Sequence, residues 1–191
     1  AGALSVSQLM ASPKAKGLFH KAIMQSAYLP AMPELKTTVY GMPSAEGYGE
    51  SFVDSLDINA ESKGGLDGLR AIPVNTLVDA SQHYEFDKAV VDGWILTEQV
   101  FEAFEGGRQH PVPLIAGFNS QECSFFSSEG YIDIPTDPEL YKKLVNKRYA
   151  DLAARYLDIY PPTDLKAAAN APIGHGLYGW ATERLSRMME N

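Results

Sequence analysis

Residues 112–123 read V-P-L-I-A-G-F-N-S-Q-E-C. The apolar run from Pro113 to Gly117 predicts a short strand, and the polar residues after it predict a loop. Two further runs, residues 21–25 and 88–92, are the other strand candidates. Strands without apolar–polar alternation are usually buried on both faces, in parallel sheets flanked by helices. The sequence therefore predicts an α/β fold with few parallel strands.

Helical patterns occupy most of the remaining chain. Apolar spacing and end signals predict helices at residues 1–11, 45–56, 62–71 and 97–106, another that begins at Pro73, and a pair over 137–159 interrupted near Lys147. A last helix carries an apolar stripe formed by Leu177, Trp180, Ala181, Leu185 and Met188. Residues 28–43, rich in Pro and Gly, predict a loop. About three strands form a small sheet for so many helices, which indicates that strands are missing and that the chain is a fragment.

Composition excludes several classes of protein. The chain has 191 residues, of which 45% are hydrophobic and 21% charged, as in ordinary globular domains. A formal net charge of -8 argues against nucleic acid as the main partner. No apolar stretch approaches the ~18 residues of a membrane span. The single cysteine, Cys123, cannot form an internal disulfide, and no spacing typical of a metal or nucleotide cofactor site is present.

Several segments, in order along nearly the whole chain, resemble the type-B carboxylesterases, a family of α/β-hydrolases. A-G-A-L-S-V at residues 1–6 is similar to the nucleophile motif G-E-S-A-G-x-x-S-V without its first three residues. Residues 12–26 resemble the family's next segment, although Ala27 replaces the usual Gly. A-V-V-D-G at 89–93 resembles P-V-V-D-G, and residues 112–123 resemble V-P-x-x-x-G-x-N-x-x-E-G. L-Y-G-W-A-T-E-R at 177–184 is similar to a helix that precedes the last strands.

The resemblance implies that Glu122 is the acid of a Ser-Glu-His triad. Its position after an apolar strand fits this role, because ligand sites in open α/β sheets collect at the carboxyl ends of strands. There Glu122 would accept the N–H of a histidine, fix its tautomer and stabilise the imidazolium. The plainer interpretation is a loop glutamate in solvent.

The same resemblance gives roles to Ala1 and Ser5. The backbone N–H of the residue after the nucleophile, here Ala1, is one oxyanion-hole donor, and small residues such as Gly2 allow the strand and helix of a nucleophile elbow to approach. Ser5 is expected to donate a hydrogen bond near the acid. The alternatives are a tight helix contact at the first residues and a surface or packed serine at position 5. Cys123, where many relatives have Gly, is expected to be packed.

The catalytic serine and histidine of the family have no counterpart in the sequence. The family's histidine lies in a segment of the form F-H-x-x-E-L-x-Y-V-F, which is absent, and its role is not transferred to His175. We therefore expect residues 1–191 to be a C-terminal-half fragment of one α/β-hydrolase catalytic domain. The parent is expected to be a serine carboxylesterase acting on small carboxylic esters without a cofactor, and the isolated chain to be inactive.

Two other interpretations of the chain remain open. The chain could belong to a non-catalytic, cholinesterase-like adhesion or binding module; Gly-Glu-Gly before Ala1 would favour that module, and Gly-Glu-Ser the enzyme. It could also be a helical domain with accidental matches.

A sheet without its central strands exposes apolar edges and faces, which favours self-association or pairing with the rest of the hydrolase domain. The sequence does not indicate a compartment.

Overall fold

A parallel pair of strands is the centre of the computed structural model, which describes residues 2–56, 65–82 and 89–190. β1 (Ala22–Gln25) pairs with β2 (Leu114–Gly117), with Ala22 opposite Leu114 and Gln25 opposite Gly117. Both strands lie where the sequence predicted them. A 3-10 turn at Pro13–Ala15 joins α1 (Gly2–Ala11) to the segment that leads into β1.

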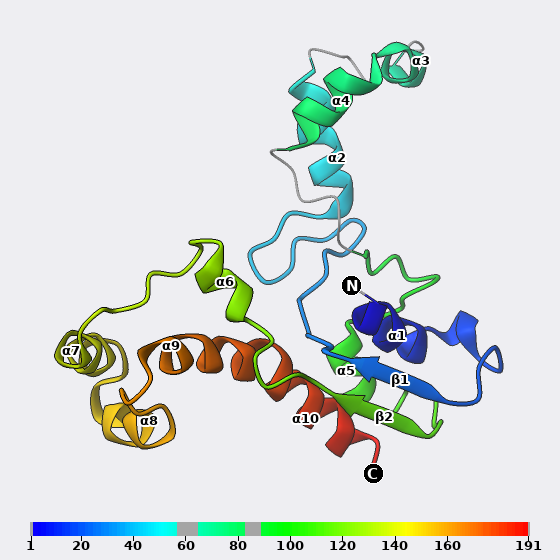
Figure 1. Ribbon diagram of the computed structural model, residues 1–191. Helices are drawn as coiled ribbons and strands as arrows, with labels where there is room; N and C mark the ends of the chain where they lie inside the picture. Colours follow the sequence, from blue (N-terminus) through cyan, green and yellow to red (C-terminus); the bar gives the residue numbers. More distant parts are fainter. Residues whose placement is uncertain (1, 57–64, 83–88, 191) are drawn as a thin grey trace.

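Three helices bury one face of this sheet. α1 packs against β1, α10 (Trp180–Met188) packs against β2, and α5 (Val100–Glu105) packs against both helices (Figure 1). Their apolar residues form one core with the inward side chains of β1, and its largest fully buried members are Met10, Met24, Met32, Phe104 and Leu185. The predicted helices at 1–11 and 97–106 and the last helix are therefore confirmed, with α5 shorter than expected.

The opposite face of the sheet is open in the described part of the chain, so the expectation of strands buried on both sides is wrong here. Ile23 is 57% exposed and Ile115 is 68% exposed, while Ala22 and Met24 are buried. Side chains alternate between the two faces of a strand, and α1, α5 and α10 reach only one of them. The exposed Ile23 and Ile115 therefore form an apolar surface against which further elements can pack.

The third strand candidate, residues 88–92, does not form a strand in its described part, residues 89–92. Val91 makes an isolated parallel bridge to Glu34. The carboxylate of Asp92 then accepts the backbone N–H groups of Trp94, Ile95 and Leu96 at 2.8–3.0 Å. This Asx-type turn supplies the local hydrogen bonds that a longer ladder would otherwise require.

Two helical groups extend from the sheet region (Figure 1). One contains α2 (Ala45–Asp54), α3 (Gly65–Ala71) and α4 (Val74–Ser81), with Ser44 as the predicted N-cap of α2 and Pro73 at the start of α4. Part of the predicted helix at 62–71, residues 62–64, lies outside the described residues. The apolar residues expected on one face of α2, Tyr48, Phe52 and Val53, are half-buried, and none is fully buried.

The second group begins with α6 (Ser124–Ser128) and continues through α7 (Pro138–Tyr149), a 3-10 turn at Ala150–Leu152, α8 (Ala153–Ile159) and α9 (Leu165–Gly174). The break between α7 and α8 lies at Ala150, whose φ of 47° is left-handed, and not at Lys147 as predicted. A π-helical segment, His175–Gly179, connects α9 to α10. This connection fixes α9 beside the loop that follows β2.

The N-cap of α7 provides a test of this second group. The Asp137 carboxylate accepts the Leu140 backbone N–H at 2.9 Å. We expect Asp137→Ala to lower the free energy of unfolding by about 1 kcal/mol, because one helix N–H loses its acceptor. Urea unfolding followed by circular dichroism measures the change. Asp133→Ala, at an exposed position in the preceding loop, is the matched control and should leave the midpoint unchanged.

Candidate functional site

Glu122 lies at the carboxyl end of β2, in the loop between that strand and α6. The loop closes on itself: the Asn119 backbone N–H donates to Glu122 Oε2 at 2.9 Å, and the Glu122 N–H donates to the Asn119 carbonyl at 3.3 Å. The carboxylate is therefore held by its own loop. Its side chain is half-buried, unlike that of an ordinary loop glutamate in solvent.

Ser26, at the end of β1, supplies a second contact to this carboxylate. Its N–H donates to the Gly117 carbonyl at 2.7 Å, which continues the parallel pairing for one more residue. Its φ of 64° is left-handed, and its hydroxyl donates a hydrogen bond to Glu122. Sequence reasoning missed this residue. The available signal was its position as the first residue after β1, because neighbouring parallel strands end at the same edge of a sheet.

These hydrogen bonds outweigh the cost of burying the charge. Partial burial raises the pKa of Glu122, but hydrogen bonds from the Asn119 backbone, the Ser26 hydroxyl and the Asn119 side chain lower it further, so the pKa lies below its usual value. The group is an anion at neutral pH and can accept an imidazole N–H. Its contribution to stability is present above its unfolded-state pKa and is lost as the pH falls through the folded-state pKa.

The Ser26 hydroxyl can be tested through this pKa. We expect Ser26→Ala to raise the pKa of Glu122 toward its ordinary value, because the ionised form loses a donor. Carboxyl ¹³C NMR during a pH titration measures it directly. Ser128→Ala removes a hydroxyl that donates to the Phe125 carbonyl at 2.9 Å and should leave the pKa of Glu122 unchanged. An unchanged pKa in Ser26→Ala would remove Ser26 from the site.

The structure places the other residues singled out in the sequence, Ser5 and Cys123, in different surroundings, and Ala1 lies outside the described residues. Ser5 is exposed on α1, and its role near the acid stays a prediction. Cys123 is buried at 1% exposure, and burial together with the Glu122 charge raises the pKa of its thiol, so it is a packed thiol and not an activated nucleophile.

His175 lies near the loop but is engaged elsewhere. Its Nδ1 is 2.8 Å from the Tyr160 hydroxyl, and its ring meets Phe118 edge to face with centroids 6.1 Å apart. It lines the same cavity as Glu122.

A hollow of 570 Å³ lies at the strand ends beside Glu122. It contains Ser26, Tyr28 and Tyr178, together with the exposed Ile23 and Ile115 of the open sheet face. No cluster of three or more side chains suited to a metal ion occurs among the described residues, and no helix in that part of the chain is long and apolar enough to cross a bilayer. The site thus provides an oriented carboxylate next to an apolar surface.

Known proteins with similar sequences and structures are esterases. The sequence profile described as "Carboxylesterase family" matches residues 1–178. Carboxylesterase 5A of Ovis aries is 37% identical over 126 residues, which cover 65% of this chain and 32% of that protein. Para-nitrobenzyl esterase of Bacillus subtilis (strain 168) is 28% identical over 172 residues, 84% of this chain and 32% of the relative.

Solved structures agree on the fold. A PNB esterase structure superposes with a TM-score of 0.63 at 22% sequence identity, and the match covers 98% of this chain and 39% of that one. The predicted α/β-hydrolase fold is therefore confirmed. The chain spans about a third of the length of the two curated relatives described above.

Proposed function

The chain belongs to the carboxylesterase family, and from this premise we propose that its parent protein hydrolyses carboxylic esters with Glu122 as the acid of a Ser-Glu-His triad. The observation that carries the proposal is the fixed, ionised carboxylate at the carboxyl end of β2. We propose that residues 1–191 are a C-terminal-half portion of one catalytic domain, with the serine before Ala1 and the histidine after Asn191.

In this mechanism the serine hydroxyl attacks the ester carbonyl while the histidine takes its proton. The tetrahedral intermediate then expels the alcohol, which receives that proton, and water hydrolyses the acyl-enzyme. Glu122 accepts the histidine Nδ1–H throughout, so the other ring nitrogen faces the serine and the imidazolium is stabilised. The Ala1 N–H donates to the oxyanion, and Ser5 supports the acid from α1.

The hydrogen bonds of Glu122 suit this role. Asn119 and Ser26 donate to the carboxylate, which lowers its proton affinity and prevents it from taking the proton of the imidazolium. They also restrict its rotation, because one oxygen is committed to the Asn119 N–H. The remaining acceptor capacity is available to a histidine.

The open sheet face supports the same proposal. Ile23 and Ile115 lie side by side in register on it, both more than half exposed. Burying such side chains is favourable by roughly 1.5–3 kcal/mol each. We infer that other segments of the hydrolase domain cover this face in the parent protein.

The isolated 191-residue chain should not hydrolyse p-nitrophenyl acetate above the buffer rate. Loss of the nucleophile or the base typically lowers kcat on the order of 10⁶-fold. A spectrophotometric assay with purified chain tests this, and a longer protein that includes the serine and histidine segments is the positive control. Turnover by the short chain that a serine-directed phosphonate abolishes would contradict the assignment of the nucleophile.

A further inference from the structure

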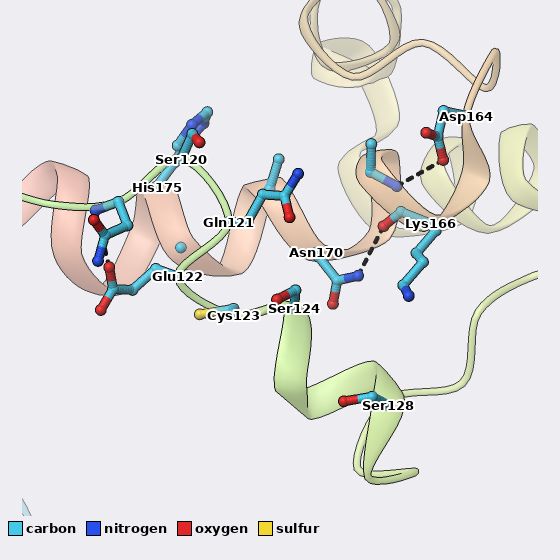
Figure 2. Close-up of a pocket in the computed structure, with 14 residues that line it drawn as sticks. Ser120, Gln121, Glu122, Cys123, Ser124, Ser128, Asp164, Lys166, Asn170 and His175 are labelled. Atoms are coloured by element: carbon cyan, nitrogen blue, oxygen red, sulfur yellow. Dashed lines mark hydrogen bonds between the residues drawn. The ribbon is translucent and has the colours of Figure 1, made fainter.

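The cavity that His175 lines lies on the α9 side of the Glu122 loop, and it shares Asn119 and Glu122 with the hollow at the strand ends. It has a volume of 420 Å³ and is lined by residues 119–124, by Ser128 of α6 and by one side of α9 along its whole length, as far as His175 (Figure 2). Cavities of this size accept small organic ligands. Its polar lining consists mostly of neutral hydroxyl and amide groups: Ser120, Gln121, Ser124, Ser128 and Asn170.

Asn170 is the buried polar residue of this lining. Its side chain is 7% exposed, and its Nδ2 donates to Ser127 Oγ and to the Lys166 carbonyl, both at 2.9 Å. A carbonyl oxygen can only accept, so the contact with Lys166 fixes which end of the amide is nitrogen. The other end, Oδ1, is buried without a hydrogen-bond partner.

An unpaired buried acceptor is unfavourable, and native structures usually satisfy such groups. Figure 2 shows the Asn170 amide between Ser124 and Lys166, on the side of α9 that faces α6. Lys166 and Ser128 are exposed, so their side chains can move to admit a ligand. Both Nδ2 protons are already used, and a ligand at this point must therefore donate.

The charges around the cavity favour a neutral ligand. Asp164 and Lys166 carry opposite charges at the start of α9, and the negative charge of Glu122, which Asn119 and Ser26 stabilise, further disfavours an anion. An anion at the N-terminus of α9 is disfavoured because the Asp164 carboxylate already accepts the Ala167 N–H at 3.0 Å. The remaining hydroxyl and amide groups both donate and accept, as the hydroxyl groups of a polyol do.

We propose that this cavity binds a neutral polyhydroxylated group, such as a glycosyl or glyceryl unit, with one hydroxyl donating to Asn170 Oδ1. Ala167 and Ala171 provide small apolar surface for the C–H face of such a group. The site is a property of the chain itself and does not depend on the esterase reaction.

Binding can be measured on the 191-residue chain by ¹⁵N NMR. Titration with methyl α-D-glucopyranoside should shift amides of residues 119–128 and 164–175 saturably, with a Kd on the order of 1 mM for a ligand of this size. Inorganic phosphate serves as the anionic probe and should cause no saturable shifts there. Saturable binding of phosphate in place of the glucoside, or no saturable binding of the glucoside, would overturn the proposal.

Three variants, one of them a control, test whether the glucoside binds in this cavity. Ala167→Phe adds a ring at an exposed α9 position on the cavity wall and should weaken glucoside binding at least tenfold. Ala154→Phe adds the same ring at an exposed position of α8 outside the cavity and should leave binding unchanged. Asn170→Leu removes the acceptor at similar volume and should weaken binding about tenfold, provided its NMR spectrum remains that of the folded chain. Equal binding in Ala167→Phe and Ala154→Phe would place the glucoside elsewhere.

Discussion

In the ester hydrolase that we propose the parent protein to be, replacing Glu122 by Gln is expected to lower kcat about 10⁴-fold. The amide keeps the size of the side chain but can present an N–H to the histidine, which favours the wrong imidazole tautomer and no longer stabilises the imidazolium. Because the proposed role of Glu122 is to orient the histidine and not to contact the substrate, KM for p-nitrophenyl acetate should change little. Steady-state kinetics on the purified variant give both values.

Glu129→Gln is the matched control for this change. Glu129 follows α6 on the same segment and is exposed. We expect its kcat to equal that of the unmodified protein. If the two variants lost activity equally, or Glu122→Gln kept full activity, Glu122 would not be the acid of the triad.

Leu185→Ala is expected to reduce the free energy of unfolding by about 2–5 kcal/mol, the range for a buried leucine whose removal leaves a cavity. Leu185 is fully buried on α10, in the core that α1 and α5 share with the sheet. A loss of this size is a large part of the roughly 5–15 kcal/mol that stabilises a typical domain. Urea unfolding monitored by fluorescence measures it.

Leu18→Ala applies the same substitution at a site that is 76% exposed. Its effect should be within about 0.5 kcal/mol, as for most surface changes. Equal losses in the two variants would mean that the core around α10 does not carry the stability of the fold.

Two of the three strand candidates and the position of Glu122 directly after β2 could be predicted because their signals are local. Residues 113–117 form an apolar run with a polar loop directly after it, and β2 and Glu122 lie where that pattern placed them. Ser44 likewise precedes the helix that it caps. In each case neighbouring residues determine the local hydrogen bonds.

The features that the sequence did not reveal depend on contacts between distant residues. Ser26 meets Glu122 only because β1 and β2 are parallel and in register, and Asn170 reaches Ser127 only because α9 packs beside α6. Residues 89–92 have strand-like composition, but the Asp92 carboxylate directs the following N–H groups into a turn. The exposure of Ile23 depends on which elements cover each face of the sheet, which composition does not specify.

We propose that Glu122 orients the histidine of a serine esterase. A crystal structure of the longer protein, with a phosphonate bound to its serine, tests this most directly. We predict that a Glu122 carboxylate oxygen lies within about 2.6–3.2 Å of the histidine Nδ1, while Asn119 and Ser26 keep their hydrogen bonds to the same carboxylate. A histidine oriented by a different acid, with Glu122 facing solvent, would contradict the account.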